Sequence, residues 1–573
     1  MNLKQHLDSR VSALLRELTG QSDAQAVVQL SKSAQFGDYQ ANGLMGLAKK
    51  AGRNPRELGT AVLEKLDLSD IADKVELAGP GFLNIHVAPA WLSSQLNALD
   101  HGRLVASAAV PQTVVIDYSS PNLAKEMHVG HLRGTIIGDA IARTFAYLGH
   151  NLIRQNHFGD WGTQFGMLIT YMQALPQQQE LGTQLSDLES FYRAAKQRFD
   201  EDPAFAETAR ENVVKLQSGD AVCRAMWQQF IAISVSHCQQ LYDRLHITLT
   251  DRDIVPESYY NERLAGVVQT LQDKGLLQES DGALCVFLDE FKTREGEPLP
   301  VIVQKTGGGF LYSTTDLAAI QYRCRELGAQ RVLYVVDARQ SLHFQQVFTV
   351  ARLAGFADAG CKLEHLSYGT MMGSDGKPFK TRSGDTIKLI DLCGEAVERA
   401  FALVSDKNPD LPEAQRRDIA ETIGIAAVKY ADLSKNRNSD YVFDWDSMLA
   451  LDGNTAPYLL YAYARIRSIF RRASLNPDAR YPVVVSATEE KALALKLLQF
   501  TEVVETLAQD CLPNQLCLYL YELSGIFMRF YEACPVLKAV GPERESRLGL
   551  CQLSALTLRQ GLELLGITPL EQM

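Results

Sequence analysis

The sequence predicts an α/β protein with a parallel sheet in its middle, a small α+β domain before it and a helical domain after it. Strand-like apolar runs alternate with amphipathic segments between residues 113 and 353, which is the pattern of βαβ units. After Asp385 nearly all apolar periodicity is helical. The 573 residues also exceed one domain of about 150 residues. We therefore expect domains at 1–108, 109–385 and 386–573.

The first domain combines helical and strand patterns. Apolar residues keep helical spacing over 3–18, and again over 49–66 around Pro55. Between Lys74 and Val87 the sequence KVELAGPGFLNIHV places two short strand-like runs around a Gly-Pro-Gly turn. Helices combined with a hairpin predict a compact α+β unit.

The middle domain begins with the strand-like run TVVID and a turn at SSPN, followed by a helix from Val129 that stops at Gly149. Strand, loop and helix make the first half of a βαβ unit. Residues 185–246 carry only helical periodicity, and we interpret them as an insertion. Strand-like runs return at 283–288, 299–304 and 331–336, where we expect the sheet to resume.

The last domain is predicted to be a helix bundle. Ser486, with Glu489 three residues later, predicts a capping box before the helical run 493–507. We expect helices to continue to the end of the sequence.

Composition narrows the class of protein. The net charge of −11 argues against a surface that binds DNA or anionic membranes by bulk charge, so a nucleic-acid partner has to meet local basic patches. No run of 18 apolar residues is present, and we expect no membrane partner. The ten cysteines are scattered, without a C-x-x-C pair or zinc-ligand spacing. They predict free thiols in a reducing compartment, a cytoplasmic location and no protein-bound metal.

The first chemical motif is His128-Val129-Gly130-His131, between the end of a strand and the start of a helix. A helix N-terminus presents free N–H groups and the positive end of its dipole, which suits a polyphosphate. Two histidines there can both donate hydrogen bonds to phosphate oxygens, and Gly130 lets a nucleotide approach the backbone. The alternative is a helix-capping histidine beside a core histidine.

The second motif is the loop GSDGKPFKTRSGDT, residues 373–386. It gathers Lys377, Lys380 and Arg382 among glycines and a proline. Such a segment can act as a mobile cationic clamp for phosphates. A solvated surface turn has the same composition and is the alternative.

Polar side chains also cluster at the predicted strand ends. Asp117 and the SSPN segment follow the first strand, the YSTTD segment begins a later helix, and Gln340 follows the strand 331–336. Open α/β sheets bind ligands in the crevice beyond the carboxyl ends of their strands. Carboxylates gathered there select a cation, and a planar guanidinium pairs with them through two hydrogen bonds. Taken singly, each residue is also explained as a helix cap or turn residue.

Basic residues alternate with aromatic ones in the last domain. The set is Lys429, Lys435, Arg437, Tyr461, Tyr463, Arg465, Arg467, Arg471 and Arg472. Rings that stack on bases and cations that meet phosphates suit RNA. A solvated helix face is the competing interpretation.

Taken together and in order, several segments resemble the class I aminoacyl-tRNA synthetases, and in particular the arginyl-tRNA synthetases. FGDYQAN and GPGFLNI are similar to that family's N-terminal appended domain, and DYSSPNLAKEMHVGHLRGTIIGDAIARTFAYLGH with RQNHFGDWGTQFGML to its nucleotide-binding signature. GGGFLYSTTDLAAI, VDARQSLHFQQVF, GKPFKTRSGDT and FDWDSMLALDGNTAPYLLYAYARI are similar in order and spacing. The resemblance covers nearly the whole chain. It implies a Rossmann-type catalytic domain with an insertion at about 170–295, and a helical anticodon-binding domain.

The resemblance also implies roles for individual residues. The catalytic residues would be Lys125, His128, His131, Lys377 and Lys380. ATP would be bound by His128, Gly130, His131, Lys377, Lys380 and Arg382. Arginine would be bound by Asp117, Ser119, Asn122, His131, Tyr312, Asp316 and Gln340. The tRNA would be contacted by Tyr39 and Asn84 of the appended domain, which meets the tRNA elbow, and by Tyr458 and Arg465.

The implied activity is a two-step ligation. L-arginine is activated by ATP with Mg²⁺ to arginyl-adenylate and then transferred to the 3′ end of tRNA(Arg), with tRNA needed before activation and a monomer as the working form. Two departures leave details open: Pro378 and Phe379 replace the Met-Ser of a KMSKS motif, and Ala456 and Tyr463 replace the expected Gly and His of a tRNA-contacting segment.

Three other functions were weighed against this one. A small-molecule nucleotidyltransferase also uses H-x-G-H at a helix N-terminus, but such enzymes are usually shorter and lack the helical last domain. A catalytically silent tRNA-binding paralogue has no chemical need for His128, Gly130, His131 and Asp316 together. The appended domain disfavours a class I lysyl or glutamyl synthetase. The carboxylates of Asp117 and Asp316 also disfavour an acidic substrate.

Overall fold

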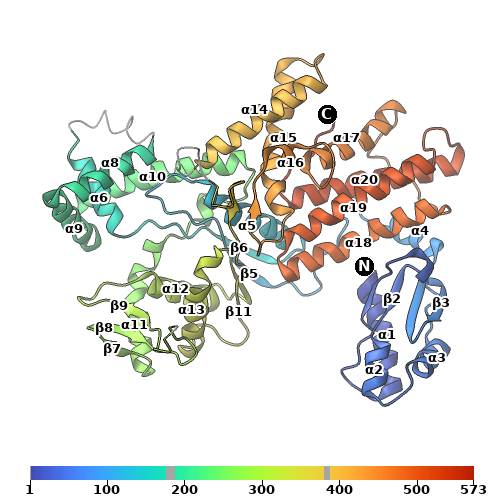
Figure 1. Ribbon diagram of the computed structural model, residues 1–573, viewed down its shortest axis with the longest axis horizontal. Coiled ribbons are helices and arrows are strands. Elements are labelled where there is room, and N and C mark those ends of the chain that lie inside the picture. The colour runs from blue at the N-terminus through green and yellow to red at the C-terminus, as the bar shows by residue number, and fades with distance from the viewer. Residues whose placement is uncertain (1, 176–186, 294, 380–386) are drawn as a thin grey trace.

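The computed structural model describes residues 2–175, 187–293, 295–379 and 387–573. Figure 1 shows the parallel sheet near the middle of the elongated molecule, with the helices of the last third on one side. The N-terminal domain lies against these helices, and the insertion lies on the other side of the sheet (Figure 1). The α/β class and the three-part organisation predicted from the sequence are confirmed.

The N-terminal domain contains one antiparallel sheet with strand order β1-β2-β4-β3. Helix α1 begins because the side chain of Asn2 accepts a hydrogen bond from the Gln5 N–H, and it ends at Gly20 in the left-handed conformation (φ 68°). The predicted hairpin is β3 and β4. The elements are α1 (Leu3–Thr19), β1 (Val28–Leu30), η1 (Ala34–Phe36), β2 (Tyr39–Ala41), α2 (Leu44–Lys50), α3 (Pro55–Lys65), β3 (Ala72–Ala78), β4 (Phe82–Val87) and α4 (Pro89–Ala98).

The central sheet is parallel throughout the described residues and has the order β11-β10-β5-β6. Helix α5 follows β5, and α13 connects β10 to β11. All four strands therefore end at the same edge, where the polar residues of the sequence motifs lie. The elements are β5 (Thr113–Asp117), α5 (Val129–Tyr147), β6 (Asn151–Gln155), β10 (Arg331–Tyr334), η5 (Ala338–Gln340), α13 (Ser341–Leu353) and β11 (Lys362–His365).

The expectation that all three later strand-like runs continue this sheet is wrong for two of them. The strands β7 (Gln278–Ser280), β8 (Ala283–Val286) and β9 (Val301–Gln304) form a separate antiparallel sheet. Alternating exposure explains the difference, because Val301 and Val303 are buried while Ile302 is 40% exposed. All four residues of β10 are buried, as expected for a strand covered on both faces.

The insertion and the last third are mainly helical. Between the parallel strands lie α6 (Thr163–Gln173), α8 (Leu188–Glu201), α9 (Pro203–Ser218), α10 (Ala221–Arg244), η2 (Asp251–Asp253), η3 (Glu257–Tyr260), α11 (Asn261–Asp273), α12 (Tyr312–Gln321) and η4 (Tyr322–Glu326). The last third contains β12 (Met371–Met372), α14 (Leu389–Lys407), α15 (Glu413–Leu433), β13 (Tyr441–Val442), α16 (Trp445–Leu449), α17 (Ala456–Arg472), α18 (Thr488–Asp510), α19 (Pro513–Ala533) and α20 (Gly541–Leu564). None of the helices in the described ranges is long and apolar enough to cross a membrane.

The predicted capping box at Ser486 is displaced by one residue. Glu490, and not Glu489, accepts hydrogen bonds from the Ser486 and Ala487 N–H groups, at 3.0 and 3.1 Å. The Glu490 carboxylate also pairs with the guanidinium of Arg547 on α20 (2.9 Å). Helix α18 therefore begins one residue later, where its first turn can use this buried anion.

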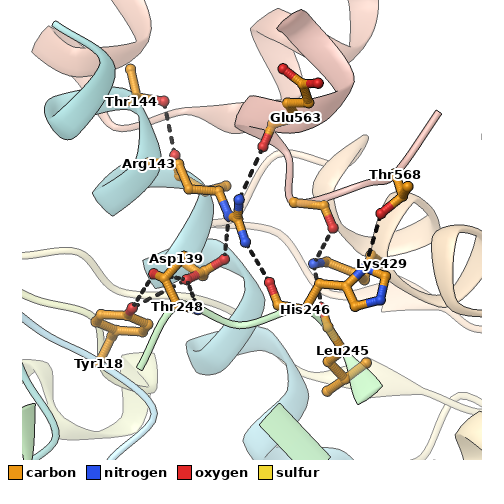
Figure 2. Close-up of polar contacts among 12 residues, drawn as sticks. Tyr118, Asp139, Arg143, Thr144, Leu245, His246, Thr248, Lys429, Glu563 and Thr568 are labelled. Atoms are coloured by element: carbon orange, nitrogen blue, oxygen red, sulfur yellow. Dashed lines mark hydrogen bonds and ion pairs between the residues drawn. The ribbon is translucent and has the colours of Figure 1, made fainter. Parts of the chain in front are cut away.

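The far end of α5 is a polar junction between the sheet domain and the helical region (Figure 2). Asp139 accepts hydrogen bonds from the Thr248 N–H (2.7 Å) and from Arg143 Nε (2.7 Å). Lys429 of α15 donates to the carbonyls of Leu245 and Gly566, each at 2.6 Å. Three segments distant in sequence therefore meet at one helix.

A second contact between these regions is made by Arg331, the first residue of β10. Its guanidinium pairs with Glu364 on the neighbouring strand and donates to the carbonyls of Ala508 and Gln509, at 2.8 and 2.9 Å. These carbonyls belong to the last turn of α18, where no intrahelical donor remains. A strand residue therefore caps a helix of the last third.

Candidate active site

The two histidines of the HVGH motif lie at the start of α5, at the strand-end edge of the sheet. His128 is the N-cap residue: its Nδ1 accepts a hydrogen bond from the Gly130 N–H (3.1 Å). His131 Nδ1 accepts from the His128 N–H (3.0 Å), and the two rings lie 4.0 Å apart. Both Nδ1 atoms are thus used by the helix start, and a neutral ring then carries its proton on Nε2.

Burial keeps both imidazoles neutral. Burial, with a smaller effect of Lys125, lowers the pKa of His128. Burial and the neighbouring His128 lower the pKa of His131 to about 3. The pair therefore supplies two Nε2–H donors without fixed charge, at a helix end whose dipole favours an anion. The capping interpretation is confirmed for His128, and donation to a phosphate stays a prediction for both histidines.

The structure gives a local reason for a glycine at position 130 that the sequence did not reveal. A Cβ at this position would lie 2.8 Å from Cε1 and 3.0 Å from Nδ1 of the His128 ring. The glycine therefore makes room for the capping imidazole. Close approach of a nucleotide remains a prediction.

Lys125 lies beside the histidines but is held by the insertion. Its Nζ is 4.6 Å from the ring centre of Tyr192 on α8, which is a cation–π contact. The cleft here has a volume of about 940 Å³. Its lining comes from the histidine segment, the insertion and the last third: Lys125, Glu126, Met127, His128, Glu189, Arg193, Phe379, Ile387, Lys388, Asp391, Leu392, Glu395 and Trp445.

The residues directly after the cationic loop pair with the histidine segment. The Val129 N–H donates to the Ile387 carbonyl (3.1 Å), and the Leu389 N–H donates to the Met127 carbonyl (3.0 Å). Lys377 is exposed in a turn in which the Gly373 N–H donates to its carbonyl (2.7 Å). Lys380 and Arg382 lie outside the described residues, so their predicted roles stay predictions.

Asp117 is already paired within the protein. Its Oδ2 accepts from Arg323 Nη2 (2.7 Å) and its Oδ1 from the Ser120 hydroxyl (2.8 Å). The Arg323 side chain is only 1% exposed, and its Nε donates to Gln155 at the end of β6. We therefore revise the prediction for Asp117: its charge is balanced by an internal guanidinium, so its remaining lone pairs act as hydrogen-bond acceptors and not as a free anion.

The other predicted arginine ligands near β5 are held in tight turns. Ser119 has a φ of 69°, and its hydroxyl lies 2.7 Å from Tyr242 Oη and 2.8 Å from Thr135 Oγ1. Asn122 is exposed, and its Oδ1 accepts from the Ala124 N–H (3.0 Å). The Ser119 hydroxyl is therefore occupied by internal partners, whereas Asn122 remains accessible.

Asp316 and Tyr312 both meet His343 of α13, the helix that begins directly after Gln340. Asp316 accepts a hydrogen bond from His343 Nε2 (2.7 Å), and the Tyr312 ring lies 5.6 Å from the His343 ring. Tyr312 is 68% exposed and Gln340 is also exposed. The sequence correctly predicted that helix α12 and the segment after β10 would meet, but His343 was not predicted as part of the set.

Glu257 is a site residue that sequence reasoning missed. Burial, and then the charges of Asp160 and Asp316, raise its pKa to about 7. Asp160 is buried and accepts from the Ser258 N–H at 2.9 Å. Glu257 lies in a short turn after the insertion, without a strand before it, so no pattern in the sequence indicated it. Three carboxylates thus face one region, which favours a bound cation.

Two predicted tRNA-binding residues are buried and cannot contact a partner, which corrects the prediction. Tyr39 is 1% exposed, and burial and the nearby Glu502 of α18 raise its pKa. Asn84 is 1% exposed and accepts from Gln40 Nε2 (2.7 Å). The FGDYQAN and GPGFLNI segments therefore build the domain and fasten it to α18. Asp38 adds an ion pair with Lys491 of α18 (2.9 Å).

The other two predicted tRNA-binding residues lie on one face of α17. Arg465 is exposed, with its guanidinium 5.9 Å from the Tyr531 ring of α19, and the Tyr458 ring lies 5.6 Å from the Tyr521 ring. Tyr461 is 47% exposed on the same helix. We call Tyr458, Tyr461, Arg465, Tyr521 and Tyr531 the α17–α19 face. Aromatic rings and a cation on one surface suit RNA bases and phosphates.

Several basic residues of the same predicted set serve the fold instead. Arg467 pairs with Glu571 (2.7 Å), and Arg471 donates to the Glu571 carbonyl (2.8 Å). Lys429 is 1% exposed, and Arg437 donates to the Cys511 carbonyl (3.0 Å). The basic composition of this stretch therefore overstated its nucleic-acid surface.

Comparison with known families divides the chain into three matches. Residues 1–87 match the arginyl tRNA synthetase N-terminal domain, residues 95–445 the catalytic domain of class I tRNA synthetases (R), and residues 459–573 the DALR anticodon-binding domain. The catalytic match contains the histidine pair, the cleft and the carboxylates described above.

Relatives and solved structures agree with this division. The chain is 56% identical to the arginine–tRNA ligases of Marinomonas sp. (strain MWYL1) and of Chromobacterium violaceum, with 100% of each chain covered. Its fold is similar to arginyl-tRNA synthetase from Plasmodium falciparum (TM-score 0.86, 30% identity, 100% of this chain and 99% of that chain). Thermus thermophilus arginyl-tRNA synthetase has a TM-score of 0.84 at 25% identity, with 100% of both chains covered. The chain therefore belongs to the arginyl-tRNA synthetase family of class I, the ligases that join arginine to tRNA.

Proposed function

We propose that this protein activates L-arginine with ATP and transfers it to the 3′ end of tRNA(Arg). The observation that carries the proposal is the arrangement at the sheet edge. Two neutral imidazoles at the N-terminus of α5 have Nε2–H groups that the helix cap does not use, and Asp160, Glu257 and Asp316 form a cluster of carboxylates. One part suits a phosphate and the other a cationic side chain.

In the first step a carboxylate oxygen of arginine attacks the α-phosphorus of ATP, and pyrophosphate leaves. His128 and His131 donate to the oxygens on which negative charge grows, and Lys125 adds positive charge at the cleft. Lys377, exposed two residues before the cleft residue Phe379, would add a second positive charge when ATP is bound. Mg²⁺ enters with ATP as part of that substrate. In the second step the terminal ribose hydroxyl of the tRNA attacks the arginyl carbonyl and AMP leaves. Positioning and charge stabilisation carry both steps, and no covalent enzyme intermediate is required.

Selection of arginine follows from the carboxylates. Asp316 and Glu257 supply the negative charge, while Asp117 offers acceptor atoms whose charge Arg323 already balances. A guanidinium fills this forked set of acceptors, whereas the single ammonium of lysine leaves part of it unpaired. Tyr312 and Gln340, both exposed, would then border the bound side chain.

The tRNA is bound by the α17–α19 face, and we propose that its arrival is needed for activation. Lys125, which lines the cleft, is held against the Tyr192 ring of the insertion. A tRNA acceptor end entering between the insertion and the last third would displace this contact. The free thiols fit a reducing, cytoplasmic compartment, and we expect a monomer.

The test is charging of total tRNA with each labelled amino acid in turn, together with arginine-dependent pyrophosphate exchange with and without tRNA. Charging with arginine alone, and exchange only when tRNA is present, supports the whole proposal. Exchange without tRNA would remove the Lys125 argument but keep the ligase. No charging, despite tRNA binding in the same sample, would favour the silent paralogue.

A further inference from the structure

Two cysteines outside the reaction chemistry lie in direct contact. Cys324 belongs to η4, the π-helical turn that ends α12, and Cys361 directly precedes β11. Their Sγ atoms are 2.6 Å apart. All ten cysteines of the chain lie in the described ranges, and nine of them are buried while Cys324 is partly exposed. Cys324 is therefore accessible to a small solute, and the buried Cys361 lies in contact with it.

The backbone on both sides of the contact is fixed. Arg352 of α13 donates to the carbonyls of Asp358 and Cys361, and the Asp358 carboxylate accepts from the Gly360 and Cys361 N–H groups, at 2.9 and 3.2 Å. The contact with the Cys324 thiol, and then the charge of Arg352, lower the pKa of Cys361, while the same contact and burial raise the pKa of Cys324. The turn that carries Cys361 thus holds its sulfur in place beside a cation, which favours the reactive thiolate.

The π-helical turn also carries a residue of the arginine pocket. Arg323, directly before Cys324, holds Asp117 of β5 and Gln155 of β6. Cys361 belongs to the apolar cluster that also contains Tyr334 and Ala319, so the sulfurs face hydrocarbon on their inner side. A charged group created at Cys324 would be forced towards this cluster or would push the turn outward.

We propose that Cys324 and Cys361 form a protective redox pair that closes to a reversible disulfide when hydrogen peroxide oxidises one of them. The first sulfur attacks the peroxide, becomes a sulfenic acid and releases one water. The other sulfur attacks that sulfenic sulfur, forms the S–S bond and releases a second water. Both thiol protons leave in these waters, and the two electrons lost by the thiols reduce the peroxide.

The role of the pair is to stop oxidation at a reversible stage. Without a partner sulfur, the sulfenic acid of Cys324 would continue to the sulfinic acid, which dithiol reductants do not reverse. That anion would disturb the turn and with it Arg323. The disulfide instead keeps the turn next to β11, and a reductant restores both thiols.

The first experiment treats the full-length protein with hydrogen peroxide and counts free thiols after denaturation. We expect a fall from ten to eight, a cross-linked peptide that contains residues 324 and 361, and return to ten with dithiothreitol. Cys285→Ser is the matched control, because Cys285 is a buried cysteine outside the pair. It should start with one thiol fewer and lose the same two. A count that stays at ten, or a cross-link that joins other cysteines, would overturn the proposal.

The second experiment separates protection from simple cross-linking. Cys361→Ser and the unchanged protein are oxidised and then reduced, and their KM values for arginine and for ATP are measured. The unchanged protein should recover fully. Cys361→Ser should gain two oxygen atoms at Cys324 and keep an arginine KM raised severalfold after reduction, with the ATP KM nearly unchanged. Cys324→Ser should show no lasting change in either KM. Equal recovery of Cys361→Ser and the unchanged protein would refute the protective role, even if the disulfide forms.

Discussion

The two ends of helix α5 use polar residues in opposite ways. At its start, His128 and His131 cap the helix with one nitrogen each and keep the other for a ligand. At its far end, Asp139, Arg143 and Lys429 are bonded to one another or to backbone carbonyls (Figure 2). Burial alone therefore does not identify a functional group. What distinguishes the two ends is whether the donors left over after folding point to protein or to an open cleft.

The largest effect is expected at the start of the helix. His131→Ala should lower the adenylation rate about a hundredfold to a thousandfold, since removal of one preorganised donor typically costs this much. Pyrophosphate exchange in the presence of tRNA measures it. The affinity for tRNA should change little. Equal loss of tRNA binding and adenylation would mean that the variant is misfolded, and a thermal unfolding curve recorded in parallel decides this.

At the far end, Lys429→Met should lower the free energy of unfolding by about 3 kcal/mol and leave the adenylation rate nearly unchanged. The Leu245 and Gly566 carbonyls lose their donor, and each unsatisfied buried group costs about 1–3 kcal/mol. Urea unfolding and pyrophosphate exchange on the same sample test this. A large loss of exchange in folded protein would contradict the division between the two ends.

The same lysine gives a pH test. Burial lowers the pKa of Lys429 from 10.5 to about 7. Between these values the folded state holds fewer protons than the unfolded state, so stability should rise with pH across this window. The slope should not exceed about 1.4 kcal/mol per pH unit. Lys429→Met should lack this slope, and an identical slope in the variant would exclude Lys429 as its source.

In the arginine pocket, the KM for arginine should fall about fivefold as pH rises through 7, because a guanidinium favours the ionised form of Glu257. Below this pH, arginine binding must expel a proton from the carboxyl group. Glu257→Gln should remove the dependence and raise the KM at high pH. Asp316→Asn is the comparison, since it should raise the arginine KM far more than the ATP KM without flattening the profile.

The smallest effect is expected at Tyr192, whose contact with Lys125 is worth about 0.5–1 kcal/mol at a partly exposed site. Tyr192→Ala should release Lys125 and raise the residual pyrophosphate exchange measured without tRNA by about two- to fivefold. Tyr192→Phe keeps an aromatic face and should behave like the unchanged protein. If both variants alter exchange equally, the hydroxyl and not the ring is responsible.

Local sequence patterns correctly predicted the elements that local interactions determine. The strand, turn and helix around His128 were predicted because apolar periodicity and a helix N-terminus are visible within one short segment. The strands β8 and β9 were assigned to the wrong sheet, because a short apolar run does not show whether its second face meets protein or water. Only exposure, such as that of Ile302, separates the two cases.

Residues whose role depends on a distant partner were the ones that sequence reasoning misplaced. Tyr39 and Asn84 look like surface residues of a binding motif, but α18, far along the chain, covers Tyr39. Asp117 looked like a free carboxylate until Arg323 was found beside it. Glu257 could be recognised as a site residue only in the folded structure, where the charges of Asp160 and Asp316 act on it.

The cap that Arg331 provides to α18 limits how the two regions can evolve. If the helical region came from a protein that places no helix end at this position, the Arg331 guanidinium would lose both carbonyl acceptors and keep only Glu364. Exchange of this region between synthetases therefore requires a matched residue on a strand of the acceptor's sheet. In the sequence this boundary looks like a linker, but Arg331 and the end of α18 have to be inherited together. Recombination at this boundary must therefore move the strand residue and the helical region as one unit.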